Sequence, residues 1–150
     1  MKKLTITLVV LTLGILTGAH AEETNFTENV EYSIGKPVIS DHAGEAKPVE
    51  GTKYLLIPVT AKNVTTDEVR IGGFGPNFQI ELQGYHYNVD MGAGWMFGNT
   101  GYYCGAETLA PLIPKTFKLV FTVPIELCNT DSVKITYPDG RTRGLLISQP

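Results

Sequence analysis

The side chains best suited to chemistry gather in one stretch of the chain, residues 85–105, which reads YHYNVDMGAGWMFGNTGYYCG. It holds a histidine, an aspartate, a cysteine, four tyrosines and the single tryptophan of the chain, with glycines between them. Histidine, aspartate and cysteine can serve as base, orienting acid, nucleophile or metal ligand when they lie within hydrogen-bond reach of each other. The stretch is therefore a candidate active site, a candidate binding loop, or an irregular edge of a structural domain.

The histidine and the aspartate have no companions at a workable spacing. His86 and Asp90 would share one face of a helix, but in a strand, which Tyr-His-Tyr favours, they lie about 13 Å apart. Asp41-His42 has the features of a loop tip. The sequence contains no Gly-x-Ser-x-Gly motif and no closely spaced Cys/His set of four metal ligands. We therefore expect no catalytic, metal or cofactor site, and a small hydrolase or metal-dependent enzyme is kept as an alternative.

The first residues predict export. Lys2 and Lys3 precede the uncharged, mostly apolar run Leu4–Leu16, and Ala19-His20-Ala21 fits a small-x-small cleavage site. This is the pattern of a bacterial secretory signal peptide over residues 1–21. The apolar run has 13 residues, whereas a membrane span needs about 20, so we expect no membrane anchor after cleavage. Residues 22–150 are then a single domain in the periplasm or outside the cell.

Charge argues against one class of partner. The net charge of the whole chain is −3, and removal of Lys2 and Lys3 with the signal peptide would take it to −5. Nucleic-acid binding requires a concentrated basic surface that engages phosphates. Lys134, Arg141 and Arg143 are the nearest approach to one, and three charges are more typical of a solvated face. We therefore expect no nucleic-acid partner.

The cysteine of the 85–105 stretch has one possible intramolecular partner. The chain contains two cysteines, Cys104 and Cys128. In an exported protein an even number of cysteines favours a disulfide. Closing this loop would stabilise the fold by roughly 3–4 kcal/mol in the chain-entropy model. We predict a Cys104–Cys128 disulfide, which leaves no thiol for catalysis.

The aromatic side chains are the remaining functional candidates. Eight of the fourteen aromatic residues and nine of the sixteen glycines lie between Gly72 and Gly105. Two interpretations are open: the rings cap one end of the domain, or they form an exposed platform, since Tyr and Trp suit surfaces where one face is buried and a polar edge meets a partner. The two interpretations are compatible. The predicted partner-binding residues are Tyr85, Tyr87, Trp95, Phe97, Tyr102 and Tyr103.

The segments that must position this stretch are predicted to be strands. Apolar and polar residues alternate over residues 55–62, 78–83 and 117–123, the pattern of strands with one face in a core. Gln83-Gly84 is predicted to turn the chain into a hairpin. Pro58 cannot donate a ladder hydrogen bond and is predicted to lie at an edge or a bulge. Further strands are expected at Val30–Ile34, Val38–Ile39, Val133–Tyr137 and Leu145–Ile147.

These elements predict an all-β fold. Six to eight short strands separated by turn residues are typical of an antiparallel β-sandwich. Strands do not alternate with helical patterns along the chain, which excludes a nucleotide-binding α/β fold.

Two landmarks resemble a known family. YLLIPVTAKNVT is a strand that ends in Lys-Asn before a turn, and LAPLIPKTFKLVFTVP is a proline-marked turn before a strand that ends in Phe-Thr-Val-Pro. This order resembles a family of exported bacterial immunoglobulin-like domains of unassigned function, which includes many lipoproteins and is related in fold to a secreted mycobacterial antigen. The resemblance covers Tyr54–Pro124. In that family the later strand follows a Pro-Gly pair. This chain departs from the family in two ways: the pair is Pro114-Lys115, and no lipid-anchor cysteine is present.

The resemblance implies an accessory or binding module and supplies no catalytic residues. We therefore predict an exported, non-enzymatic domain that recognises a macromolecular partner, a protein or another envelope component. The alternative from a different class is a structural envelope subunit whose edge strands pair with copies of itself.

Overall fold

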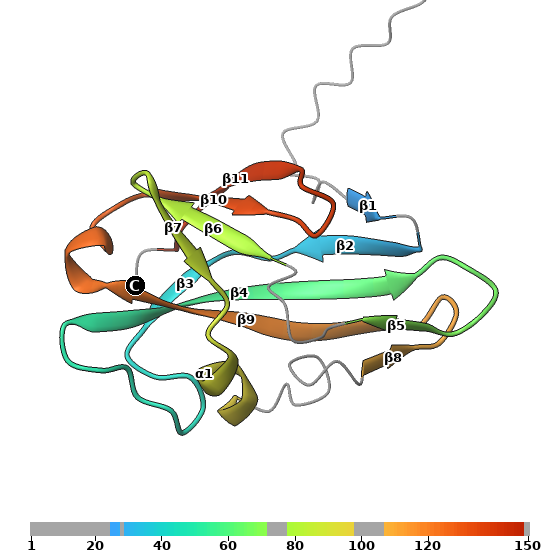
Figure 1. The fold of residues 1–150 in the computed structure, drawn as a ribbon, viewed down its shortest axis with the longest axis horizontal. Helices are drawn as coiled ribbons and strands as arrows, with labels where there is room; N and C mark the ends of the chain where they lie inside the picture. The colour runs from blue at the N-terminus through green and yellow to red at the C-terminus, as the bar shows by residue number, and fades with distance from the viewer. Residues whose placement is uncertain (1–24, 28, 72–77, 98–106, 149–150) are drawn as a thin grey trace, which may run out of the picture.

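The computed structural model describes residues 25–27, 29–71, 78–97 and 107–148, arranged as in Figure 1. Within these ranges the chain forms eleven strands and two short helices, α1 (Met91–Met96) and the 3-10 helix η1 (Ile125–Leu127). The strands are β1 (Asn25–Thr27), β2 (Val30–Ile34), β3 (Val38–Ser40), β4 (Thr52–Asn63), β5 (Val69–Ile71), β6 (Gln79–Leu82), β7 (Tyr85–Asn88), β8 (Glu107–Leu109), β9 (Pro114–Pro124), β10 (Ser132–Thr136) and β11 (Thr142–Leu146).

The strands form two facing sheets and one short ribbon. The first sheet has the order β1-β2-β4-β3, with β9 also paired to β4, and the second has the order β11-β10-β6-β7. The ribbon consists of β5 and β8, and every strand pair is antiparallel. The two sheets lie one above the other in Figure 1. The predicted all-β sandwich is therefore confirmed. The extra strands β1, β5 and β8 have three residues each, too few to show a periodicity.

The core lies between the two sheets and is built from the alternating residues that the sequence pattern indicates. Every second side chain of β4 and β9 points into it, and the second sheet contributes the apolar face of β6, β10 and β11. These contributors include Leu55, Ile57, Val59 and Ala61 on β4, Phe117, Leu119, Phe121 and Val123 on β9, and Phe78, Ile80 and Leu82 at β6. Burial of each large side chain contributes about 1.5–3 kcal/mol.

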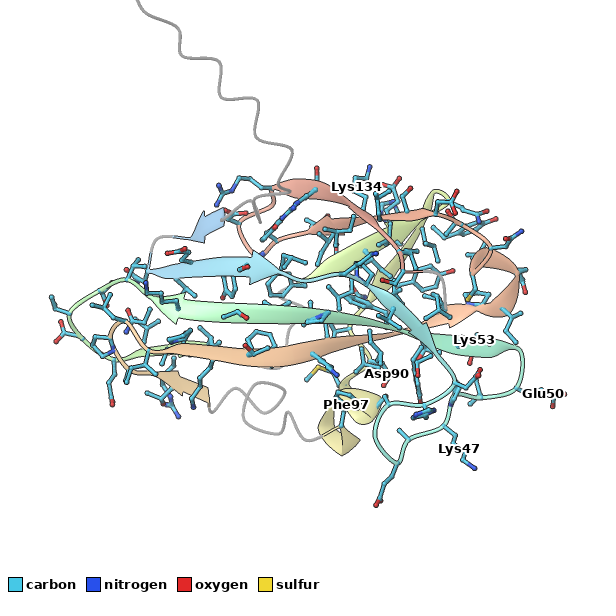
Figure 2. The ribbon with its side chains drawn as sticks, turned by 180° about the vertical axis from the view of Figure 1, so that it is seen from behind. Lys47, Glu50, Lys53, Asp90, Phe97 and Lys134 are labelled. Carbon is cyan, nitrogen blue, oxygen red and sulfur yellow. The ribbon has the colours of Figure 1, made fainter. Side chains whose placement is uncertain are left out.

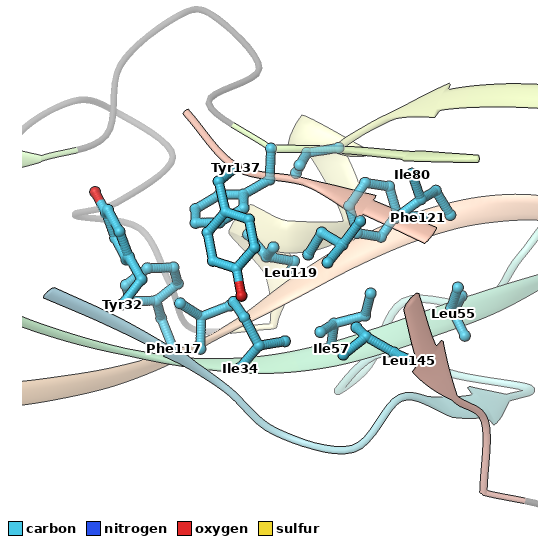
Figure 3. Packing of buried hydrophobic residues seen from close by; sticks show 14 of the residues in the cluster. Tyr32, Ile34, Leu55, Ile57, Ile80, Phe117, Leu119, Phe121, Tyr137 and Leu145 are labelled. Carbon is cyan, nitrogen blue, oxygen red and sulfur yellow. The ribbon is translucent and has the colours of Figure 1, made fainter. Parts of the chain in front are cut away.

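Three aromatic rings join the sheets at one side of this core. Tyr32 meets Phe78 edge-on with 5.3 Å between ring centroids, and Phe78 lies 6.0 Å from Tyr137. Figure 3 shows the Tyr32 hydroxyl directed away from the cluster and the Tyr137 hydroxyl directed into it. The Tyr137 hydroxyl is buried without a hydrogen-bond partner in the described part of the chain.

Pro58 does not lie at a sheet edge, which was one of the two places predicted for it. β4 is the central strand of its sheet, and Pro58 lies opposite Lys118 of β9. On its other side Pro58 faces the break between β2 and β3, where its carbonyl accepts a 2.8 Å hydrogen bond from the Gly35 amide. A Cβ at Gly35 would lie 3.1 Å from the Pro58 Cβ. The missing donor is tolerated because the neighbouring ladder is interrupted at this point.

Helix α1 was not expected from the sequence, and it adds a partial third layer. The Asp90 Oδ1 accepts a hydrogen bond from the Ala93 amide at 2.9 Å, which is an N-cap interaction. The helix packs on the outward face of β9, where Val120 is fully buried. We call this group the outer cluster: Ala43, Ala46, Tyr54, Ala93 and Val120, with Leu56 and Phe97 packed against it. Neither helix of the described residues has the length and apolar character needed to cross a membrane.

Asn63 joins the two sequence landmarks. Its side chain is fully buried, and its Nδ2 donates to the carbonyl oxygens of Asp67 at 2.6 Å and Leu109 at 2.9 Å. Its Oδ1 accepts from both the amide and the hydroxyl of Thr65. The predicted Asn-containing turn is thus formed around one amide side chain that satisfies four hydrogen bonds.

The proline-marked turn is formed at Pro111-Leu112, three residues before Pro114-Lys115, where the resemblance places the Pro-Gly pair. Leu112 has a φ of 62°, and the Ile113 amide donates to the Ala110 carbonyl at 3.3 Å. A positive φ after Pro111 is the geometry of a type II turn, in which glycine is favoured. Pro114 instead begins β9. The position that calls for glycine is therefore Leu112 and not Lys115.

Candidate functional site

Tyr85 and Tyr87 lie on β7, the edge strand of the second sheet. Gln83 and Gly84 connect β6 to β7 with φ values of 50° and 85°, as a two-residue type I′ turn requires. The predicted hairpin is confirmed, with Leu82 opposite Tyr85. Both tyrosines share the sheet face of the buried β6 residues. Because β7 is at the edge, Tyr85 remains 61% exposed while Tyr87 is half-buried against the core.

The hairpin lies beside η1 at one end of the sandwich. The Gln83 Nε2 donates to the Leu127 carbonyl at 3.4 Å, and Leu127 and Cys128 pack on the same core as Tyr87. Ile125 on η1 is 47% exposed. We call this surface the end patch, defined by Tyr85, Tyr87, Ile125, Leu127 and Cys128. It presents two exposed apolar side chains backed by three half-buried ones.

The two titratable groups in the half-buried part of the end patch, Tyr87 and Cys128, both have raised pKa values, which favours their neutral forms. Burial raises the pKa of Tyr87, and neighbouring Tyr85, Glu126 and Cys128 act in the same direction. Burial also raises the pKa of the Cys128 thiol, against a smaller opposing effect of Lys53. A raised pKa reduces the thiolate fraction, so Cys128 has little nucleophilic character. The chemistry that remains is hydrogen bonding and apolar contact.

Cys128 has a free thiol within the described residues, and its Sγ donates to the Pro124 carbonyl at 3.3 Å. Its predicted partner, Cys104, lies outside the described residues. The disulfide therefore stays a prediction.

The other predicted contact residues do not join Tyr85. Phe97 packs against the outer cluster, and the Lys118 Nζ lies 5.0 Å from its ring centroid, a cation–π contact. Figure 2 shows Phe97 and Asp90 below β9, on the opposite side of the molecule from Lys134. Phe97 therefore packs on the outward face of the first sheet and not beside Tyr85. The Trp95 side chain, Tyr102 and Tyr103 lie outside the described residues.

The candidate metal ligands Asp90, His86 and Asp41 make three different kinds of contact in the structure. Asp90 caps α1, and its Oδ2 accepts from the Thr122 hydroxyl at 2.5 Å. His86 is exposed on β7, opposite Glu81. Asp41 pairs with Lys53 at 2.9 Å in an exposed loop. Among the described residues, no group of three His, Cys, Asp or Glu side chains is placed to hold a metal ion.

Polar side chains form rows across the outward face of the second sheet. Lys134, Glu81 and His86 are successive neighbours on β10, β6 and β7. The Lys134 Nζ lies 2.7 Å from Glu81 Oε2. This contact with Lys134 is the main cause of the lowered pKa of Glu81, and His86 adds to it. In the next row the Gln79 Nε2 donates to Asn88 Oδ1 at 2.9 Å.

The contribution of η1 to the end patch was not expected from the sequence. Ile125 and Leu127 follow Pro124 and continue the apolar and polar alternation of β9, so they resemble the end of a strand. The signal that could have found the turn is Pro124 itself, which stops ladder pairing and begins the 3-10 helix.

Comparisons with known proteins give the fold without a function. No family model and no curated protein matches the chain. Three solved structures of similar fold are a conserved hypothetical protein from Bacillus anthracis, an uncharacterized β-sandwich protein from Clostridium difficile, and a Bacillus subtilis protein classed provisionally as a lipoprotein.

The three structures match over most of this chain. Their TM-scores are 0.65, 0.55 and 0.53, their sequence identities are 16%, 16% and 10%, and they cover 83%, 85% and 85% of this chain. The matched part is 93%, 91% and 39% of the respective neighbour. At such identities the likeness establishes the β-sandwich and not an activity.

Proposed function

We propose that the protein is an exported, non-enzymatic binding domain that recognises another macromolecule through the end patch. The observation that carries the proposal is Tyr85, a large aromatic side chain that is 61% exposed on an edge strand. Exposed tyrosines with a buried backing are typical of contact residues, because they provide apolar area and a hydroxyl at low entropic cost. Ile125 and the half-buried Tyr87 extend the same surface.

The expectation of a non-enzymatic role rests on what the titratable side chains of the candidate stretch contact. Asp90 is used as a helix cap and His86 continues a polar row on a sheet face. Neither contact resembles the nucleophile–base–orienting group arrangement of covalent catalysis. Cofactor and metal requirements are therefore not part of the proposal.

Export is supported by the leader-like residues 1–21 and, as a weaker indication, by the lipoprotein class given to one structural neighbour. We place the protein in the periplasm or outside the cell, with an envelope protein or another envelope component as partner. Membership of the exported immunoglobulin-like family, with its relation to a secreted mycobacterial antigen, is part of this proposal and rests on the two landmarks.

Site-specific photocrosslinking tests the proposed surface. Benzoylphenylalanine is introduced at position 85 and, as a control, at position 146, because Leu146 is 66% exposed on the opposite edge strand β11. Irradiation of cells that export each variant should give a discrete covalent adduct from position 85 and none from position 146. An identical adduct pattern from both positions, or none from position 85, would contradict the proposal.

A second candidate function is a self-associating envelope subunit, favoured by the edge of β7 that has no partner strand among the described residues. Light scattering of the purified protein across a hundredfold concentration range separates the two functions. The binding domain should keep the mass of one chain, and a mass that rises with concentration would support self-association.

A further inference from the structure

On the side away from β6, the backbone amide and carbonyl groups of β7 face no partner strand among the described residues. In a two-residue hairpin the closing pair, Leu82 and Tyr85, is hydrogen-bonded, and bonded pairs alternate along the ladder. The amide and carbonyl groups of His86 and Asn88 therefore point away from β6. Asp90 confirms this alternation, because its amide donates outward to the Val120 carbonyl at 2.7 Å. Among the described strands β7 pairs only with β6.

The edges of β9 and β11 carry features that hinder pairing, whereas the side chains of the shorter strand β7 do not. The Asp90–Val120 hydrogen bond occupies part of the edge of β9 and, on its other side, the chain two residues beyond the end of β7, so that His86 and Asn88 of β7 are not used by it. On β11, Arg143 lies opposite Ile135 and so places a charge on the inward face, a feature that natural edge strands use against pairing. The four residues of β7 include no charged Lys, Arg, Asp or Glu, and no proline. β7 is thus the least protected of these three edges.

The two faces of β7 differ in the side chains that a neighbouring strand would meet. On the inward face Tyr87 offers an apolar neighbour within the end patch. On the solvent-facing side of the sheet, an added strand would place one of its residues next to His86. That residue would extend the row Lys134, Glu81 and His86. A carboxylate fits there, because it accepts a hydrogen bond from the imidazole N–H. Beside Asn88 the free amide hydrogens favour a polar acceptor, since its Oδ1 is used by Gln79.

We propose that the partner binds as an added β-strand on the edge of β7: an extended polypeptide segment with an acidic residue beside His86 and an apolar residue beside Tyr87. This inference rests on the proposed function, since it specifies how the end patch is engaged. Backbone hydrogen bonds to His86 and Asn88 supply affinity, and the alternating side chains supply selectivity.

A pair of synthetic peptides tests the chemistry of the added strand. The first is the capped pentapeptide Val-Thr-Val-Glu-Val, and the second replaces its glutamate by lysine. Titration into the isotope-labelled protein should shift the His86 and Asn88 amide resonances and slow their hydrogen exchange. The Tyr87 amide, which already bonds to β6, should change less. The lysine peptide should bind about three- to fivefold more weakly.

Three results of this titration would overturn the inference. One is the absence of any change at His86 and Asn88 up to millimolar peptide. Another is equal binding of both peptides. The third is that the same amides shift when the protein is concentrated without peptide, which would identify a second copy of the chain as the occupant.

Two variants of one residue separate the backbone from the side chain. His86→Pro removes the outward amide donor and leaves the bonds between β6 and β7, whereas His86→Ala keeps the donor and removes only the imidazole. Peptide binding should be lost in His86→Pro and weakened about threefold in His86→Ala. Unchanged amide resonances of β6 in each variant show that the hairpin is folded.

Binding of the native partner distinguishes a failure of the strand-addition inference from a failure of the proposed function. If the partner crosslinked from position 85 binds His86→Pro as tightly as the unmodified protein, strand addition is wrong and the binding domain remains. If position 85 captures no partner, the proposed function itself fails, whatever the peptides do.

Discussion

The two ends of the sandwich both expose large apolar side chains, but they differ in how their polar groups are used. At the Asn63 end, Leu112 and Ile113 are 64% and 58% exposed, yet their segment is fastened to Asn63, whose Nδ2 donates to the Leu109 carbonyl and whose carbonyl accepts from the Leu112 amide. At the end patch, Tyr85 is as exposed, and within the described part of the chain the adjacent edge of β7 pairs with no strand. Exposed side chains alone therefore do not identify a contact surface, and this edge distinguishes the end patch.

The largest expected effect is the contribution of the predicted Cys104–Cys128 disulfide, which would stabilise the end patch, to the free energy of unfolding. If Cys104 and Cys128 form a disulfide, reduction should lower the free energy of unfolding by roughly 3–4 kcal/mol, because the released loop regains entropy in the unfolded chain. Urea denaturation with and without reductant measures this loss. Thiol titration of the denatured, unreduced protein should find no free thiol, and two free thiols would show that the bridge is absent.

At the opposite end, Asn63→Ala should cost about 3 kcal/mol. The substitution leaves the Asp67 and Leu109 carbonyls and the Thr65 amide without their partner, and each unsatisfied buried group costs roughly 1–3 kcal/mol before water compensates. Asn88→Ala is the matched control, because that amide is exposed and makes one hydrogen bond. Urea denaturation compares the two variants. Equal losses would mean that the Asn63 network is not the structural anchor of this end.

Leu112→Gly should raise the free energy of unfolding by up to about 1 kcal/mol. A leucine with a positive φ destabilises the folded chain by roughly 1–2 kcal/mol. Glycine removes this strain, but part of the gain is lost because glycine has more conformational freedom in the unfolded chain. The exposed Leu112 side chain contributes little burial. Thermal unfolding measures the change, with Ile113→Gly as a control that should destabilise. A clear loss in Leu112→Gly would imply that this side chain makes stabilising contacts despite its exposure.

Much of the fold could be predicted because β4, β6 and β9 each keep one buried face over several residues. The position of Pro58 could not, since its sequence shows the missing donor but not the interruption of the neighbouring strand beside Gly35. Helix α1 has weak local signals, with Gly92 and Gly94 in six residues, and it is held by Asp90 and by packing on Val120.

The candidate site was predictable only in part. Tyr85 and Tyr87 follow directly from their place after a recognisable hairpin turn. Phe97 is also an aromatic residue of the same stretch, but it follows α1 and packs in another layer, where Asp90 is joined to Val120 by a long-range hydrogen bond. Ile125 joins the end patch through the tertiary contact of η1 with Gln83, which no local pattern encodes.

The most direct test of the central claim compares Tyr85→Ala with Leu146→Ala in both stability and affinity for the partner crosslinked from position 85. Both side chains are exposed, so each substitution should change the free energy of unfolding by less than about 0.5 kcal/mol. Tyr85→Ala should weaken partner binding by at least about thirtyfold, as expected for a central aromatic contact, and Leu146→Ala should leave it unchanged. A Tyr85→Ala variant that binds normally, or one that loses binding only because it unfolds, would contradict the assignment of the end patch as the contact surface.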